Sequence, residues 1–405
     1  MSVRGAATLG DDRTSLRETG ARWARGGLAI GVLGLAAGAG IAGLGPAGWS
    51  RFLASYLVSW VYFLSLALGM LFFVLIQHVT RAGWSVAVRR IAEGFAPNVL
   101  VPMTLLGAPI LLGLDRLYPW TDHAAVAADH MLEAKTAWLN VPFFLARTVC
   151  YVLVWSVLAI WFHRKSTEQD ATRDPRTTVA LETASTAALI LFAFTVTFFA
   201  FDYLMSLTPR WYSTIFGVYF FSGCVVGSFA LMIVAASVVQ RAGALRRAIT
   251  IEHYHDLGKL MFAFTIFWAY IGFSQYMLMW YANLPEETVW YAARQTGSWT
   301  AWSLLLLFGH FLLPFFALMS RATKRRKGVL VAGAVWMLAM QWADVWWMVM
   351  PEKSPGSIGL SFLDLAIALG IGGLFFAAAA RRLGAHALLP EHDPRLPESL
   401  GFENT

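Results

Sequence analysis

Cysteine is nearly absent from this sequence, in which only Cys150 and Cys224 occur among 405 residues. The two lie far apart, and neither belongs to a C-x-x-C-H motif, a ferredoxin-type cysteine run or a zinc-binding spacing. A c-type haem, an iron–sulfur cluster and a structural zinc each require such a pattern. We therefore expect the chain itself to bind none of these groups.

Charged residues are also scarce, at 14% of the chain against roughly 25% in a soluble domain, while 58% of the residues are hydrophobic. The apolar residues gather in ten runs, each long enough to cross a hydrocarbon core of about 30 Å as a helix. Barrel strands would alternate apolar and polar residues, which these runs do not. The pattern predicts an all-α polytopic membrane protein, because backbone groups in lipid must bond one another. The predicted spans are residues 26–44, 53–77, 92–113, 141–162, 179–201, 214–239, 258–282, 298–320, 329–350 and 361–380.

Lysine and arginine are unevenly divided between the loops that alternate along these spans. One set of loops carries most of them, including the run "RATKRRK" at 321–327. Basic loops stay in the cytoplasm. We therefore predict cytoplasmic tails, 1–25 and 381–405, on a ten-helix domain, 26–380, in the bacterial inner membrane. The first tail is too polar for a cleaved signal peptide. The opposite loops hold only Arg51, Arg116, Lys135, Arg210, Arg294 and Lys353.

The formal net charge of +7 follows from this asymmetry. Anionic membrane lipids are the expected partners of the basic loops. A nucleic-acid partner would need a basic face on a soluble module, and the sequence contains no such module.

The ionisable residues predicted near the cytoplasmic ends of their spans are His78 and, as candidates for a proton pathway, Glu93, Glu182 and Lys259. A charge at the bilayer centre costs on the order of 3 kcal/mol, so ionisable groups within spans are candidate functional residues. These three can form the entrance of a proton pathway. Alternatively, their side chains simply reach the headgroup region.

Arg147, Asp344 and Asp364 are predicted in the outer third of their spans. A buried arginine keeps its charge and needs an anionic partner, whereas each aspartate needs either a cation or a proton. Both a proton pathway and structural salt bridges between helices fit this pattern.

His310 lies in the middle of the apolar run "SLLLLFGHFLLPFFALMS" (303–320), at about the depth of Tyr270 in "WAYIGFSQYMLMWY" (268–281). Histidine gains and loses a proton near neutral pH at small cost. A titratable group between two acidic tiers predicts two half-channels that meet at His310. The alternative is a core histidine that donates to a backbone carbonyl.

Tryptophan is abundant, with 18 residues, many of them near the predicted outer ends of the spans. Most belong to the ordinary interfacial belt of membrane proteins. Trp342 and Trp346, however, flank Asp344, and a flat quinone head favours aromatic walls with a few polar groups. We therefore predict His310, Trp342, Asp344 and Trp346 as quinone contacts.

Three long phrases carry a resemblance to a known family: "DYLMSLTPRWYSTIFGVYFFSG" (202–223), "LGKLMFAFTIFWAYIGFSQYMLMWYANLPEETVWY" (257–291) and "SLLLLFGHFLLPFFALMSRATKR" (303–325). Over about residues 50–380 the chain resembles the F subunit of alternative complex III, a bacterial quinol:electron acceptor oxidoreductase. This subunit belongs to the NrfD/polysulfide-reductase-type membrane proteins. The resemblance implies two four-helix bundles, about 53–201 and 214–350, with the first and last helices peripheral.

The resemblance also implies partners and cofactors. The partners are a C-type NrfD-like paralogue, an iron–sulfur protein, a multihaem cytochrome c and, in some complexes, a haem–copper oxidase. Haem c and iron–sulfur clusters then lie in those partners, and a quinone or quinol is the remaining ligand. In the family the C-type paralogue is the better-supported quinol site, and the F-type subunit is assigned to proton movement or a second quinone site.

Two other functions fit the sequence. Pro102 and Pro314 interrupt spans, as in secondary transporters with broken helices, so a stand-alone proton-coupled transporter is one alternative. A passive membrane anchor, in which every buried charge belongs to a salt bridge, is the other.

Overall fold

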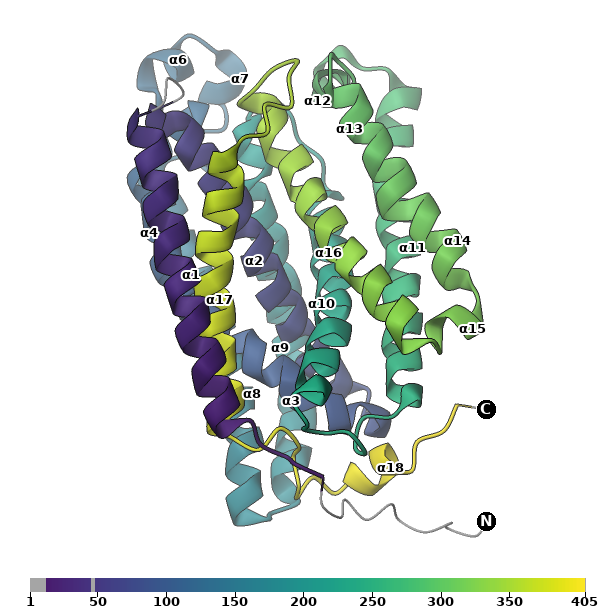
Figure 1. Ribbon diagram of the computed structural model, residues 1–405. Coiled ribbons are helices and arrows are strands. Elements are labelled where there is room, and N and C mark those ends of the chain that lie inside the picture. The colour runs from purple at the N-terminus through teal and green to yellow at the C-terminus, as the bar shows by residue number, and fades with distance from the viewer. Residues whose placement is uncertain (1–11, 45–47, 405) are drawn as a thin grey trace.

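The computed structural model describes residues 12–44 and 48–404 (Figure 1). Within these ranges it contains no β-strand and ten helical segments that are long and apolar enough to span a membrane. The prediction of an all-α polytopic membrane protein is confirmed. Residues 1–11 of the predicted N-terminal tail, and Thr405, lie outside the described residues.

Eight of the ten spans are single helices that match the predicted runs to within a few residues at most ends. α1 begins inside the predicted N-terminal tail, and α8 continues well past residue 162, where the sequence turns polar. The eight are α1 (Arg17–Leu44), α2 (Gly48–Val79), α8 (Val141–Thr172), α9 (Arg176–Tyr203), α10 (Phe216–Arg241), α11 (Ile251–Ala282), α16 (Lys327–Val349) and α17 (Phe362–Ala385).

The third span is interrupted. It consists of η1 (Gly83–Ser85), α3 (Val86–Phe95), η2 (Ala96–Val99) and α4 (Met103–Leu112), and its breaks coincide with Pro97 and Pro102, which lack a backbone N–H. It begins nine residues before the predicted start. Arg89 and Arg90, which lie between the predicted spans 53–77 and 92–113, are helical and buried within α3.

The eighth span changes helix type in its middle. α13 (Trp299–Leu305) passes into a π-helix, η5 (Leu306–Leu312), and then into α14 (Leu313–Met319), with no gap between them. The remaining elements are short and lie in loops: α5 (Leu114–Leu117), η3 (Pro119–Thr121), α6 (His123–Ala127), α7 (His130–Glu133), η4 (Met205–Leu207), α12 (Pro285–Arg294), α15 (Arg321–Lys324), η6 (Met350–Glu352) and α18 (Leu396–Leu400).

The spanning helices form two groups of four that meet at α2 and α10. The first group is α2, α3–α4, α8 and α9, and the second is α10, α11, α13–α14 and α16. In α2 and α10, 89% and 83% of the apolar segment is buried, against 17% in α1. α1 packs along α17 at the edge of the molecule (Figure 1). Two four-helix bundles with two peripheral helices are therefore the observed arrangement.

The two ends of the helical bundle differ. We call the end at which α1 begins and α18 lies the terminal face, and the end that carries α6, α7 and α12 the distal face (Figure 1). Residues 386–404 cross the terminal face from the first group to the second. Ser399 accepts from the backbone N–H of Ala87 at 3.0 Å, and Asn404 donates to Glu252 of α11 at 3.3 Å. This C-terminal segment therefore connects the two bundles.

Candidate functional site

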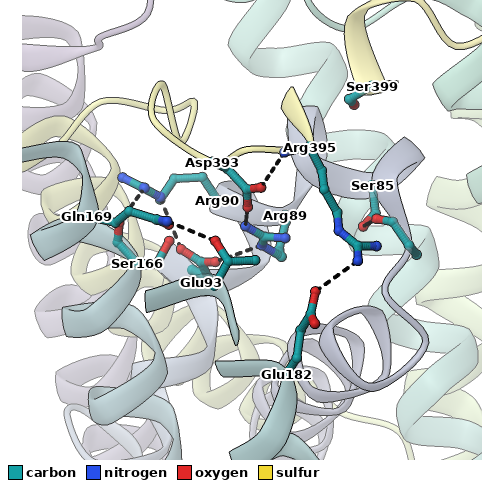
Figure 2. A network of polar contacts seen from close by, with 12 residues as sticks. Ser85, Arg89, Arg90, Glu93, Ser166, Gln169, Glu182, Asp393, Arg395 and Ser399 are labelled. Atoms are coloured by element: carbon teal, nitrogen blue, oxygen red, sulfur yellow. Dashed lines mark hydrogen bonds and ion pairs between the residues drawn. The ribbon is translucent and has the colours of Figure 1, made fainter. Parts of the chain in front are cut away.

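The acidic residues predicted near the terminal face each have cationic partners. Glu93 lies between Arg89 and Arg90, with N–O distances of 3.2 and 3.0 Å (Figure 2). Arg89 also pairs with Asp393 of the C-terminal segment, and Arg90 pairs with Asp170 at 2.8 Å. Glu93 is thus part of a buried ion-pair network.

Glu182 and Lys259 are paired as well. Glu182 meets Arg395 at 3.1 Å, as Figure 2 shows, and Arg81 at 3.2 Å. Lys259 pairs with Asp256 and donates to Asn404 at 2.8 Å. The C-terminal segment supplies a partner to each of the two.

Two of the charged residues predicted in the outer third also form ion pairs, near the distal face. Asp364 of α17 meets Arg51 of α2 at 2.8 Å. Arg147 of α8 binds both carboxylate oxygens of Asp202 of α9, at 2.7 and 2.9 Å, and Tyr151 donates to the same carboxylate at 2.6 Å. These contacts tie pairs of helices together.

Asp344 has a different environment. It is 1% exposed on α16, and no lysine, arginine or histidine of the described residues lies within ion-pair distance of it. Its carboxylate accepts from the Tyr219 hydroxyl of α10 and, at 3.2 Å, from the Trp268 indole N–H of α11. Among the predicted site residues, Asp344 is the acid whose partners are all neutral.

Trp268 contacts both His310 and Asp344. The imidazole stacks on the Trp268 ring with the centroids 4.0 Å apart, and neither ring nitrogen has a hydrogen-bond partner among the described residues. His310 lies in η5. π-Helical turns are rare in proteins, and those that occur are often found at functional sites. We call Tyr219, Trp268, His310 and Asp344 the Asp344 cluster.

A cavity of about 450 Å³ adjoins this cluster, and Tyr219 and Trp268 form part of its wall. Phe273 of α11 and Leu304 and Leu307 of α13–η5 also line it, and each is about half exposed or more, so the cavity opens between these helices toward the surrounding lipid. Apolar and aromatic walls with a few polar groups are typical of small-molecule sites.

Arg294, at the end of α12, forms the polar part of the cavity wall on the distal side. It is fully buried, and it donates to the carbonyl oxygens of Trp347 and Met348 at 3.1 and 2.9 Å, near the C-terminal end of α16. Burial lowers the pKa of Arg294 to about 10, and Glu352, 3.6 Å away, opposes that shift. The guanidinium thus fixes α12 to the end of α16.

Three predicted site residues lie elsewhere. Trp342 and Trp346 contact each other in a tilted arrangement, with the ring centroids 5.1 Å apart. They do not line the cavity, because residues two positions from Asp344 project from the other side of α16. Tyr270 is 63% exposed on the outside of α11. The structure does not bring these residues together with Asp344 and His310.

Sequence reasoning missed Tyr219, Trp268 and Arg294. Tyr219 and Trp268 carry no charge and lie among other aromatic residues, so nothing in the sequence set them apart. Arg294 belongs to the segment 280–299, whose sequence is typical of an amphipathic helix on the surface. Its burial follows from its contacts with the end of α16, which the sequence does not indicate.

The fold and this site define a polytopic α-helical membrane protein with a buried acid beside a lipid-facing cavity. No protein-family model and no curated protein matches the chain.

Proposed function

We propose that the chain is an NrfD-type membrane subunit of a bacterial respiratory quinol:electron acceptor oxidoreductase, similar to the F subunit of alternative complex III, and that Asp344 carries protons in it. The observation that carries this proposal is the environment of Asp344, a buried acid in a spanning helix whose partners among the described residues are all neutral. Intramembrane acids of this kind are typical of proton relays.

The surroundings of Asp344 support both of its protonation states. Burial in an apolar bundle favours the neutral acid, since no cation compensates a carboxylate there. The hydroxyl of Tyr219 and the indole N–H of Trp268 stabilise the charged form when it is present. A group that can hold either state is suited to take up and release a proton.

His310 is the second titratable group of this proton site. Neither ring nitrogen has a hydrogen-bond partner in the described part of the chain, so both nitrogens are available to a water molecule or a ligand. Glu93, Glu182, Lys259, Asp364 and Arg147 have compensating partners, and we assign them to the ion pairs that support the helices. The proposed proton route therefore contains fewer residues than the route predicted from the sequence.

The cavity beside the cluster fits a quinol head group. Its volume, its aromatic walls and its opening toward lipid match a flat, lipid-soluble ligand. Tyr219, Tyr291 and Arg294 would orient the ring oxygens from the walls, in place of the predicted Trp342 and Trp346. A bound quinol supplies two protons and two electrons, and the electrons pass to haem or iron–sulfur partners.

Those partners are a C-type paralogue, an iron–sulfur protein and a multihaem cytochrome c, with a haem–copper oxidase in some complexes. The folded loops of the distal face, with α5–α7 and α12, offer them a structured surface. Turns alone would suffice to connect spanning helices, so folded loops favour docking of extramembrane proteins.

Replacing Asp344 by asparagine in the intact complex tests the proposal. The amide oxygen can still accept from the Trp268 indole, and the amide NH2 can donate to the Tyr219 hydroxyl, but the group cannot carry a proton. We therefore expect fewer protons moved per electron with the complex still assembled. Proton-to-electron ratios in reconstituted vesicles provide the measurement. Tyr270→Phe, on the lipid-facing side of α11, is the matched control. A ratio equal to that of the unchanged protein would contradict the proposal.

Copurification separates this function from the two alternatives. A respiratory subunit carries stoichiometric haem proteins with it, whereas a stand-alone proton-coupled transporter is isolated without them. A passive anchor would copurify with haem proteins and show normal proton movement in the Asp344→Asn variant.

A further inference from the structure

Gln341 is a buried polar side chain close to the Asp344 cluster but outside it. It lies on α16 three residues before Asp344 and is fully buried. Neither its amide oxygen nor its amide nitrogen has a hydrogen-bond partner among the described residues. Buried polar groups are otherwise paired with protein or ordered water, so an amide of this kind needs an explanation.

α10 provides a glycine-lined recess for this amide. A methyl group added to Gly223 would lie 2.8 Å from the Gln341 nitrogen and 2.9 Å from its oxygen. A methyl group added to Gly227 would lie 3.2 Å from the Gln341 side chain. The space on this face of α10 is therefore occupied by the amide, and alanine at residue 223 would displace it.

The recess and the proton site belong to one interface. Tyr219, Gly223 and Gly227 are four residues apart along α10, and Gln341 and Asp344 are three apart along α16, so each set shares a helix face. The two faces pack against each other, with Tyr219 bonded to Asp344 and Gly223 against Gln341. Since α16 starts at the terminal face, Gln341 lies about one turn closer to that face than Asp344.

We propose that the Gln341 amide holds an ordered water molecule beside Asp344, and that Asp344 exchanges its proton with the terminal side through this water. The inference rests on the proposed function of Asp344. Side chains three apart on a helix have Cβ atoms about 5–6 Å apart, a separation that one bridging water spans. Buried waters typically bind two to four polar groups. The amide supplies two atoms without a partner among the described residues, and each carboxyl oxygen of Asp344, which already accepts one hydrogen bond, keeps a second lone pair.

The water passes a proton on without being consumed. It accepts the Asp344 proton on a lone pair and releases a different proton to a further water molecule on its terminal side, so it ends as water, Asp344 ends as a carboxylate and the further water carries the proton on. The amide of Gln341 takes no proton itself, and it acts as a positioning residue that keeps the water in line.

Gln341→Leu tests this role, because leucine fills the recess and removes both polar atoms. The intact complex is compared with its variant by infrared difference spectroscopy in H₂¹⁶O and H₂¹⁸O. The carboxyl band of Asp344 is assigned by its loss in Asp344→Asn. We expect Gln341→Leu to shift this band, to abolish its sensitivity to the water isotope and to lower the proton-to-electron ratio. If Gln341→Leu melts at a higher temperature and leaves the band unchanged, the inference is overturned, because the amide would then be an unsatisfied polar group without a role at Asp344.

Gln240→Leu is the matched control. Its amide nitrogen donates to the carbonyl oxygens of Leu245 and Ile249, at 2.9 and 2.7 Å, so this variant should melt at a lower temperature without changing the Asp344 band. If Asp344→Asn lowers the proton-to-electron ratio and Gln341→Leu does not, the inference fails and the proposed function stands. If neither variant lowers the ratio, the proposed function fails as well.

A density map of the unaltered complex gives a second measurement that does not depend on folding of the variants. A peak within hydrogen-bond distance of both the Gln341 amide and the Asp344 carboxyl supports the inference. A map that resolves other buried waters and shows no peak there overturns it.

Discussion

Asp202 and Asp344 lie near the distal ends of α9 and α16, and both are almost fully buried. Arg147 neutralises Asp202 with two hydrogen bonds, and Tyr151 adds a third. Asp344 likewise accepts hydrogen bonds from a tyrosine hydroxyl, that of Tyr219, and from the Trp268 indole N–H, but no arginine of the described residues pairs with it. One arginine thus separates a structural ion pair from a site that can carry a proton.

Arg147→Met is expected to destabilise the protein, because Asp202 would keep its buried position and lose its cation. Removing one partner of a buried ion pair typically costs about 3–5 kcal/mol. Thermal unfolding of the purified protein in detergent measures the loss. Adding Asp202→Asn to this variant should recover part of it, since the uncompensated charge is gone. A single variant as stable as the unchanged protein would show that the pair contributes little.

At the scale of elements, α1 and α17 pack with their backbones in close approach. A methyl group added to Gly373 of α17 would lie 2.5 Å from the backbone nitrogen of Gly31 in α1. Small residues of this kind allow helix association in a membrane, where apolar burial gives no net attraction between helices. The peripheral position of the pair therefore depends on glycine.

Gly373→Leu should separate α1 from α17. The leucine side chain has no space against Gly31, and overpacking of this kind typically costs about 1–3 kcal/mol. Gly26→Leu, on α1, is the control, because no atom lies within 4 Å of a methyl group placed there. The melting temperature in detergent should fall in the first variant and stay near its original value in the second. Equal melting temperatures would contradict a close α1–α17 contact.

For the molecule as a whole, the basic loops and the C-terminal segment share one face. The basic run 321–327 and the C-terminal segment both lie at the terminal face (Figure 1). This face is predicted to be cytoplasmic, since basic loops are retained there. The C-terminal segment, which pairs with Arg89 and Glu182, would then cover the cytoplasmic ends of both bundles.

Reporter fusions measure the orientation. Green fluorescent protein attached after the last residue should fluoresce, because it folds on the cytoplasmic side. Alkaline phosphatase fused at Lys353, in a distal loop, should be active, because it acquires its disulfides only outside the cytoplasm. The opposite pattern of activities would invert the predicted topology and reverse the direction of the proposed proton route.

The predicted spans agree with the helices because apolar length is a local property of the chain. The third span departs from its prediction for a non-local reason. Arg89 and Arg90 resemble loop residues in the sequence, and they are helical and buried because Asp170 and Asp393, distant in the sequence, neutralise them. The π-helix at His310 has no counterpart in the apolar pattern either, since that pattern does not distinguish helix types.

The candidate site could be predicted in part. Asp344 and His310 stood out because ionisable residues are rare in apolar runs. Their neighbours could not be predicted, because the sequence gives depth along a helix and leaves the rotation of the helix about its axis undetermined. The rotation of each helix directs Trp342, Trp346 and Tyr270 away from the Asp344 cluster. It directs Tyr219 and Trp268 toward the Asp344 carboxylate, and Gln341 toward Gly223 of α10.

Local properties of the sequence establish a helical membrane protein, and they predict how many times the chain crosses the membrane and at what depth its charges lie, because each of these depends on the cost of placing a local segment in lipid. Which charges are compensated depends on how the helices pack, and this follows from the three-dimensional structure. An ion pair such as Arg51 with Asp364 forms within about 3 Å between helices that are hundreds of residues apart. No local pattern reports such a contact, and its absence at Asp344 is what marks the proposed proton site.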